Sequence, residues 1–481
     1  MLRQPYIDFH CHPQMKPYGR SFKNARGQNS TSKKKENSIW FYDAPNLFER
    51  ALQLLCGICK FSQADCTTLA YGNVKIVCAS LYPIERGFFL NDLGGGVTSE
   101  LANDFITCLS RPRVDYIQKV KNYFEDLQRE YDYYEQLNRK VIPIDNANYA
   151  YVLVSSINEI ENCFLKNVPI DNVVFVIPSI EGLHSLDTNI DTPPDESVFI
   201  ENVSKIKQWR CPPFFVTFSH HFGNRLCGHA RSLTDLVGNV TDQRFMLNEG
   251  FTPLGRKVLS HLLDENNGKR IYIDVKHMSA KGRQEYYDIL AADYAHESIP
   301  IIISHGACNG YRSNAEQVID TKETGLKFLH EDINFYDEEI LLVAKSKGIF
   351  GLQLDERRIA NKATLNETKH SARLNKVRHY RAALLWNQVQ HIAELLDRHD
   401  LFAWDCMALG TDFDGIINPL NGYLTSETMP HLIDYLERHA HNYMIDRGKM
   451  ILKSYNQITP SEIVNRIFVS NGYEFLRQFL L

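Results

Sequence analysis

The sequence predicts an α/β protein of the (β/α)8, or TIM, barrel class with long insertions. Eight short runs rich in Val and Ile, each bounded by polar, Gly or Pro residues, are typical of buried parallel strands. Segments with helical periodicity lie between them, and no GxGxxG or Walker-type loop supports the alternative, an open doubly wound sheet. Such a barrel needs about 250 residues. Nearly half of the 481-residue chain is therefore insertion or appendage.

The expected strands cover eight segments in order: 6–11, 74–81, 173–177, 213–218, 270–275, 300–304, 348–354 and 406–410. Apolar residues recur three or four positions apart in four helical segments, 113–137, 283–291, 337–344 and 375–398. Strands that alternate with helices imply right-handed crossovers and a parallel sheet, and a count of eight favours closure.

We expect one domain over residues 1–481, with insertions at about 14–72, 84–172 and 355–405. Within the first insertion, the polar segment 19–38 resembles a mobile loop. Near the end of the chain, Thr459 and Glu462 form a capping box with Pro460 at the first helical position. This box predicts a helix that runs to about residue 469, before Asn471 and Gly472.

Composition argues against two classes of partner. The formal net charge of -5 gives no basic field for nucleic acid or an anionic membrane. No apolar run approaches the roughly 18 residues that span a bilayer, and no signal peptide opens the sequence. Eleven cysteines, an odd number, fit a reducing compartment better than a disulfide framework. We therefore expect a cytoplasmic protein that acts on a small molecule.

Candidate metal ligands follow the expected strands at the face where barrel active sites lie. Histidines two apart on one strand point the same way, and imidazole nitrogen suits zinc. A carboxylate beyond a buried strand can satisfy both oxygens by bridging two cations. Each residue alone reads as an ordinary polar or capping residue, but their common position favours a two-metal site made of His10, His12, Glu181, His277, His305 and Asp412.

At two places near this face, two neighbouring residues could each supply the functional side chain. Asp412 lies nearer its strand than Asp414, which we interpret as a turn residue before Gly415. Of the adjacent histidines after the fourth strand, we assign His220 to the site and give His221 a supporting or structural role.

These residues, in this order, resemble the membrane (renal) dipeptidase family of metallopeptidases, which belongs to the amidohydrolase group of metal-bearing barrels. Besides the ligands, the segments similar to the family's motifs are 179–186, 218–220 with Asn224, 273–279, 303–305, 410–415 and 471–477. The resemblance implies one zinc ion on His10, His12 and Glu181. It implies a second on Glu181, His277 and His305.

The resemblance also implies roles in the reaction. His220 polarises the substrate, Asp412 handles the proton of the bridging water, and Arg312 matches the family's arginine for the substrate carboxylate. A homodimer is a further implication. The family usually has His-x-Asp on the first strand, whereas this chain has His10-Cys11-His12, which removes one negative charge.

The expected function is that of a dinuclear zinc dipeptidase, in which a metal-bridging hydroxide attacks the amide carbonyl of a small dipeptide. A related two-metal hydrolase of non-peptide amides, lactones or phosphoesters is the alternative within enzymes. A catalytically silent barrel used for binding is the alternative outside them.

Overall fold

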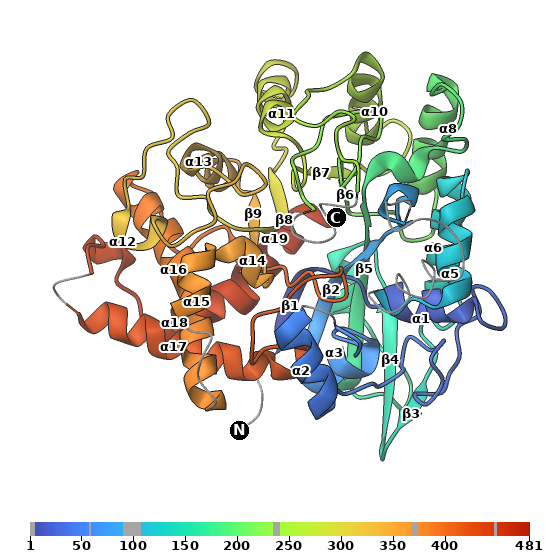
Figure 1. The fold of residues 1–481 in the computed structure, drawn as a ribbon, viewed down its shortest axis with the longest axis horizontal. Helices are drawn as coiled ribbons and strands as arrows, with labels where there is room; N and C mark the ends of the chain where they lie inside the picture. The colour runs from blue at the N-terminus through green and yellow to red at the C-terminus, as the bar shows by residue number, and fades with distance from the viewer. Residues whose placement is uncertain (1–4, 57–58, 90–106, 234–240, 368–372, 447–449) are drawn as a thin grey trace.

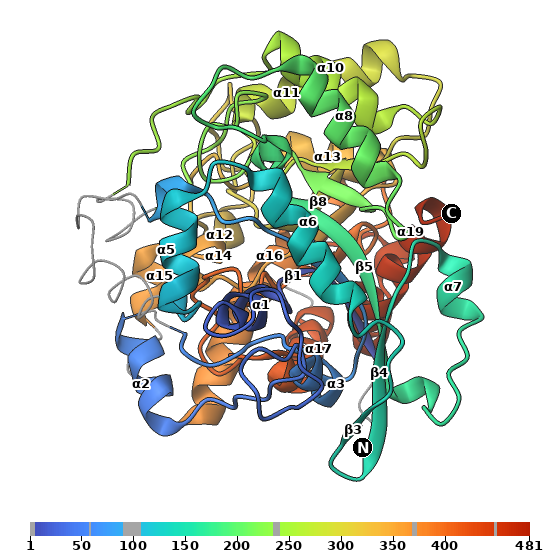
Figure 2. The ribbon, with the colours of Figure 1, turned by 90° about the vertical axis from the view of Figure 1, so that its right-hand side faces the viewer.

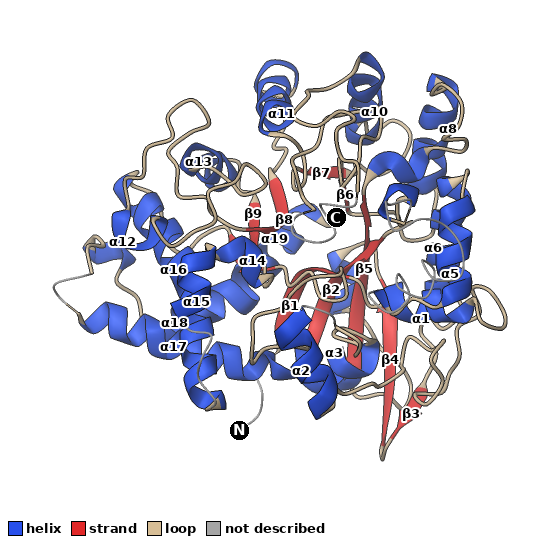
Figure 3. Cartoon of the chain, viewed as in Figure 1, coloured by secondary structure: helices blue, strands red, loops and turns tan. Residues whose placement is uncertain are grey.

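The computed structural model describes residues 5–56, 59–89, 107–233, 241–367, 373–446 and 450–481, and parts of all three expected insertions lie outside these ranges. Its centre is a barrel of eight parallel strands surrounded by helices (Figures 1 and 3). The strands hydrogen-bond in the order β1 (Tyr6–Cys11), β2 (Val74–Leu81), β5 (Val173–Glu181), β6 (Phe215–Thr217), β7 (Tyr272–Asp274), β8 (Ile302–Gly306), β9 (Ile349–Leu352) and β10 (Met407–Leu409). The prediction of the barrel and of all eight strands is confirmed.

The barrel closes at the carboxyl ends of its strands. The backbone N–H of Asp412, just after β10, donates to the carbonyl of His10 at 2.8 Å. The N–H of His12 donates to the carbonyl of Phe413 at 2.9 Å, and Cys11 and Phe413 form a parallel bridge. The first and last strands are therefore joined where the candidate ligands lie.

The strands are apolar because they are covered on both faces. Every residue of β1 and of β5 is buried. Polar residues still occur inside these strands: Asp8, Asp274 and Ser304 are completely buried. A buried polar group needs hydrogen-bond partners, and these three have them in the interior beneath the candidate site.

The helices form the outer layer (Figure 3). Their bounds are α1 (Met15–Ser21), α2 (Leu47–Cys56), α3 (Cys66–Gly72), α5 (Arg111–Lys119), α6 (Tyr123–Glu135), α7 (Ile157–Glu161), α8 (Glu196–Lys207), α10 (Pro253–Leu263), α11 (Ala280–Asp293), α12 (Lys322–Gly325), α13 (Asp337–Lys345), α14 (Glu356–Ile359), α15 (Lys362–Glu367), α16 (Leu374–Arg398), α17 (Met429–Ile445), α18 (Pro460–Asn465) and α19 (Asn471–Phe479). The predicted helices at 283–291, 337–344 and 375–398 are confirmed as parts of α11, α13 and α16. None of the helices in the described part of the chain is long and apolar enough to cross a membrane.

The single helix predicted over 113–137 is wrong, because two helices, α5 and α6, occupy this segment. Val120 is extended, with ψ 137°, and ends α5. The side chain of Asn122 then accepts a hydrogen bond from the N–H of Glu125 and starts α6. The apolar periodicity continues across the break, so it gave no sign of this cap.

The insertion between β2 and β5 also adds a hairpin of β3 (Ile142–Ile144) and β4 (Ala147–Leu153), which extends beyond the barrel (Figures 1 and 2). β4 pairs in parallel with the first half of β5, whereas β6 pairs with the last two residues of β5. One edge of β5 is thus shared by two strands. This ninth parallel strand was not predicted from the sequence.

The polar segment 19–38 begins inside α1, and its residues 22–38 contain neither helix nor strand. Part of it is anchored to α6, since the amide of Asn29 donates to the carbonyl of Tyr133 at 3.1 Å. Asn29 is buried and its side-chain oxygen accepts from the N–H of Ile39. This loop is therefore held against the protein at its middle.

The predicted helix end near Asn471 and Gly472 is wrong. α18 passes through a π-helical turn, η6 (Arg466–Ser470), directly into α19. Gly472 permits close packing rather than ending the helix, since a Cβ there would lie 2.7 Å from Cε2 of Phe9. At the other end the N-cap half of the predicted capping box is present, because Thr459 accepts from the N–H of Glu462 at 3.2 Å.

Candidate metal centre

The structure brings the six predicted ligands together. Three overlapping groups, each with ligand atoms within 4.8 Å of one another, are His10–His12–Glu181, Glu181–His277–His305 and His10–His305–Asp412. Glu181 belongs to two of them. The side chain of Asp412 is 14% exposed, whereas that of Glu181 is 3% exposed. Glu181 is therefore shielded from solvent, whereas solvent reaches the cluster at Asp412.

The backbone holds several of these residues in unusual conformations. His277 and Asp412 have φ angles of 66° and 60°, in the left-handed region that non-glycine residues seldom adopt. Gly182, directly after Glu181, has φ 90°, and a Cβ there would lie 2.4 Å from the ring of His184. Such backbone strain persists where the surrounding structure imposes it, and it gathers at functional sites.

The spacing of the imidazole nitrogens fits shared cations. Nε2 of His10 and Nε2 of His12 are 3.2 Å apart, and those of His277 and His305 are 3.3 Å apart. Two nitrogens that bind one zinc ion tetrahedrally at about 2.0–2.1 Å lie about 3.3 Å from each other. Each pair thus has the separation that one cation requires.

Glu181 lies between the two pairs. Its Oε2 is 3.1 Å from Nε2 of His12, and its Oε1 is 3.5 Å from Nε2 of His277 and 3.6 Å from Nε2 of His305. Nε2 of His10 is also nearest Oε1, at 3.4 Å, so Oε2 faces His12 alone. The carboxylate thus lies within reach of all four histidines, as a ligand shared by both pairs requires. Burial opposes its charge, but His220 and His10 outweigh this effect and hold the pKa of Glu181 well below its usual range.

Ser304 orients two of the histidines. Its hydroxyl donates to Oδ2 of Asp274 at 2.6 Å, so its oxygen is left to accept from Nδ1 of His10 at 3.0 Å and Nδ1 of His305 at 2.9 Å. Nδ1 of His12 donates to the carbonyl of Ser80 at 3.0 Å, since a carbonyl can only accept. These three rings are therefore held through Nδ1 and turn Nε2 inward, the arrangement typical of metal-binding histidine.

His277 differs from the other three. Its Nδ1 is buried and has no hydrogen-bond partner among the described residues. Burial, followed by the charge of His220, holds the pKa of His277 well below its usual range. The ring is therefore neutral, as a ligand must be, but nothing fixes which nitrogen carries its proton.

The charged groups of the cluster shift the pKa values of Asp412 and His12. Burial and the nearby charge of Glu181 raise the pKa of Asp412, despite a hydrogen bond from His12. Burial opposes charge on His12 as well, but Asp412 and Glu181 outweigh it and raise the pKa of His12 to about 10. Two carboxylates, Glu181 and Asp412, thus have pKa values shifted apart, which is a common sign of divided acid and base roles.

His220 lies beside the cluster, with Nε2 3.5 Å from Oε1 of Glu181. Its Nδ1 donates to the carboxylate of Glu85 at 3.1 Å, and Glu85 also accepts from the hydroxyl of Tyr82 and from the N–H of His221 at 3.1 Å. Burial opposes charge on His220, but Glu85 and Glu181 raise its pKa. The ring is thus oriented to present Nε2–H toward the cluster.

Sequence reasoning missed the supporting residues. Asp8 and Asp274 had a visible signal, since each is a carboxylate within an apolar strand, where an unpaired charge is costly. Glu85 had none, because it lies in the insertion after β2 and meets His220 only in the folded chain. Ser304 was part of a recognised segment, but its contact with three side chains is a property of the fold.

Arg312 does not join the cluster. Its side chain is 51% exposed and pairs with Glu316 at 2.8 Å and with Asp320 at 2.9 Å, both on its own loop. Both partners of this guanidinium are thus carboxylates of its own loop, and its assignment to a substrate carboxylate stays a prediction.

A cavity of about 290 Å³ lies next to the residues that hold His220. Its lining includes Glu85, His184, Tyr123 and Phe222. It includes none of the six candidate ligands, so it adjoins the cluster through Glu85 rather than enclosing it.

The fold matches those of solved metallopeptidases. Dipeptidase AC, a metallopeptidase of family M19, is 14% identical and superposes with a TM-score of 0.52 over 99% of each chain. The M19 dipeptidases have the fold of this chain. A metallopeptidase from Rhodobacter sphaeroides, solved with a phosphinate mimic of the dipeptide L-Ala-D-Ala, is 13% identical, with a TM-score of 0.50 over 99% of each chain. No family model matches the sequence, and no curated protein does.

The resemblance to this family that the sequence indicated is therefore confirmed as a likeness of fold. Together, the M19 fold and the clusters of histidine and glutamate support a metal-dependent hydrolase. At identities of 13–14%, the roles of individual residues rest on the geometry of this chain.

Proposed function

We propose that this protein is a dipeptidase that uses two divalent cations, with Zn²⁺ the first candidate. One observation carries the proposal: two pairs of Nε2 atoms, His10 with His12 and His277 with His305, converge on the carboxylate of Glu181. The donors, imidazole with carboxylate, are those that zinc prefers. The first cation would lie with His10, His12 and Glu181 and the second with Glu181, His277 and His305.

When bound, two such cations lower the pKa of water and polarise a carbonyl oxygen. Asp412 suits the role of base, because its raised pKa and partial exposure allow it to take a proton from water and return it to the leaving amine. In this step the water oxygen bonds to the amide carbon, the C–N bond breaks, and the proton moves through Asp412 to nitrogen.

His220 suits the role of oxyanion stabiliser. Glu85 fixes its Nδ1, so Nε2–H is directed toward the position where charge develops on the substrate oxygen. A donor held in place before the reaction stabilises this charge more effectively than water does. The cavity beside Glu85 offers room for one end of a small substrate.

A dipeptide is the first substrate to test, since the Rhodobacter sphaeroides metallopeptidase of the same fold was solved with a mimic of one. Non-peptide amides, lactones and phosphoesters come next, because the same two-metal chemistry serves them. Loops at the barrel mouth select among these substrates.

The test is hydrolysis of a mixed dipeptide library, followed by mass spectrometry, before chelation, after chelation and after zinc is restored. We expect cleavage that is abolished by chelation and restored by zinc. The control variant His296→Gln, at an exposed histidine outside the cluster, should cleave as the wild type does. Cleavage of other amides or esters alone would replace the dipeptidase assignment by the related hydrolase. Cleavage that persists without metal would contradict both.

A further inference from the structure

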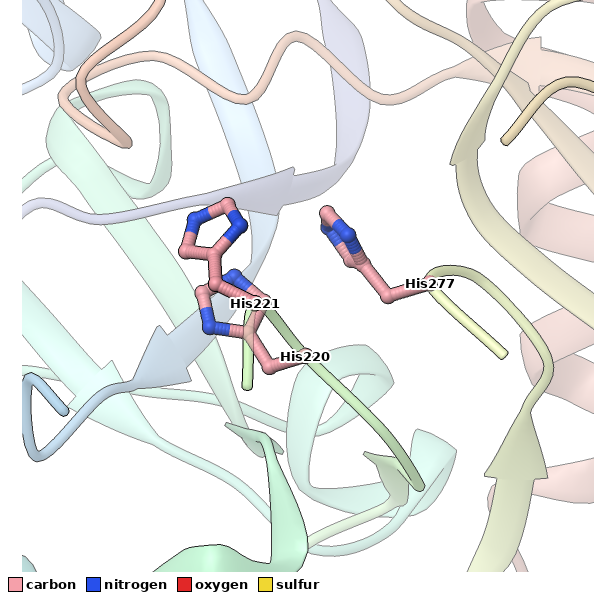
Figure 4. A group of neighbouring side chains, drawn as sticks. All are labelled: His220, His221 and His277. Atoms are coloured by element: carbon pink, nitrogen blue, oxygen red, sulfur yellow. The ribbon is translucent and has the colours of Figure 1, made fainter. Parts of the chain in front are cut away.

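A fourth group of candidate ligands lies beside the two-metal cluster. His220 and His221 follow β6 and His277 follows β7, and one nitrogen from each ring lies within 4.8 Å of the others. Figure 4 shows the three imidazoles gathered in the space between these two loops. The ring centroids of His220 and His277 are 4.5 Å apart, and those of His221 and His277 are 5.3 Å apart.

The outer hydrogen bonds of this group are those of metal-binding histidines. Nδ1 of His220 donates to Glu85, and Nδ1 of His221 lies 2.7 Å from Oγ of Ser232. Gln243 donates to the same Oγ at 3.0 Å and holds it in place. Metal-bound histidine nearly always engages its second nitrogen with such a partner. Both rings therefore keep Nε2 for a ligand.

The third ring supplies an independent observation. The side chain of His277 is 8% exposed, and its Nδ1 has no hydrogen-bond partner within the described ranges. An orphaned buried nitrogen is rare in folded proteins and calls for an explanation, such as an ion. The Nε2 of His277 faces Glu181 and His305. Nδ1 is thus the nitrogen that remains for this group.

We propose that His220, His221 and His277 form a third cation position, specific for a transition metal such as Zn²⁺, that is occupied only at excess metal. The group contains three imidazoles and no carboxylate, which favours zinc over hard cations such as Mg²⁺. The absence of a carboxylate also makes it weaker than the positions at Glu181. When both neighbouring positions are filled, His277 would serve both, with Nε2 toward Glu181 and His305 and Nδ1 toward this group.

A cation in this position inhibits the enzyme, because it replaces the proton on Nε2 of His220, which is released to solvent. That atom can then no longer donate a hydrogen bond to the substrate oxygen. This consequence rests on the proposed function, whereas the binding of the cation does not. The two claims therefore need separate measurements.

Binding is tested first, by anomalous diffraction at the zinc absorption edge and by equilibrium dialysis with elemental analysis. For the wild type in excess zinc, we expect about three zinc ions per chain, and for His221→Gln about two, because one imidazole ligand is removed. The third anomalous peak should lie among His220, His221 and His277. His296→Gln, an exposed change, should behave as the wild type.

Two outcomes would overturn the proposal. One is the absence of a third peak in the wild type at saturating zinc, with both positions at Glu181 filled. The other is a third zinc ion that His221→Gln retains with unchanged affinity, since that result identifies adventitious surface binding only.

Inhibition is tested next on any substrate that the library identifies. We expect excess zinc to inhibit the wild type, and His221→Gln to need an at least about tenfold higher zinc concentration for the same inhibition, the scale of effect of one ligand contact. Equal inhibition of both proteins would contradict the inhibitory role. If no substrate is found, the dipeptidase assignment fails while the diffraction result still decides the binding.

Discussion

The two ends of the metal cluster are built differently. At the β1 end, His10 and His12 belong to or directly follow a buried strand, and each Nδ1 is held, by Ser304 or by the carbonyl of Ser80. At the β7 end, His277 lies on a loop in a left-handed conformation, and its Nδ1 has no partner in the described part of the chain. Ligands fixed before binding hold a cation more tightly than ligands that must be ordered.

This difference predicts a tightly held cation at the β1 end and an exchangeable one at the β7 end. A chelator should therefore remove metal in two phases, the β7 cation first. The following variants test or extend this comparison.

Glu181→Gln should have the largest effect, because Glu181 is the ligand that both ends share. We expect loss of both cations and of activity down to background, since an amide carries no negative charge to offset them. Elemental analysis and peptide hydrolysis measure both losses. The exposed Glu201→Gln on α8 is the control, and a Glu181 variant that keeps two cations would contradict the bridging role.

His220→Ala should come next, and it separates chemistry from metal binding. We expect kcat to fall by about 100- to 1000-fold, the usual cost of one oxyanion donor, with both cations retained. A fall in metal content of the same protein, measured at limiting zinc, would show that His220 acts as a ligand of the main cluster instead.

Ser304→Ala should have a smaller effect on metal binding, because it changes only the orientation of two histidine rings. It removes the acceptor of Nδ1 of both His10 and His305, so we expect metal affinity to fall by about 10- to 100-fold. Both chelation phases should then become faster, because one histidine at each end loses the partner of its Nδ1. Ser185→Ala, at a buried serine whose Oγ bonds no described group, serves as the control. Chelation phases with unchanged rates would contradict the orienting role of Ser304.

Glu130→Gln should have the smallest effect, on stability rather than catalysis. Glu130 supports the β1 end through Gln14, whose Nε2 donates both to Glu130 at 2.9 Å and to the Ser80 carbonyl that also holds His12, at 2.6 Å. Burial raises the pKa of Glu130 to about 7, although the bond from Gln14 opposes this shift.

The folded protein therefore favours the protonated carboxyl. The stability that this provides is complete below the unfolded pKa, near 4.5, and is lost as the pH rises through about 7. Replacement by Gln should remove this slope, so the free energy of unfolding of the wild type relative to the variant should fall by on the order of 3 kcal/mol between pH 4.5 and 8. Denaturant unfolding at both pH values measures it, and parallel pH profiles would contradict the assignment.

The same two ends show how far sequence reasoning reaches. Local pattern located all eight strands of the barrel, because buried parallel strands are short apolar runs. It also selected six candidate ligands at the ends of these runs, which the fold gathers in one cluster. It could not find Glu85 or Gln14, whose partners His220 and Ser80 are distant in sequence. The break at Asn122 and the continuous helix through Gly472 depend on one cap and one close contact, which periodicity does not record.

In the proposed function, Glu181 and four histidines hold two cations. The most direct test is elemental analysis of the wild-type protein purified without added metal, and again after incubation with zinc and removal of the excess. We expect about two zinc ions per chain, as a two-metal hydrolase requires, and their loss in Glu181→Gln. A protein that binds no zinc even after incubation would contradict it.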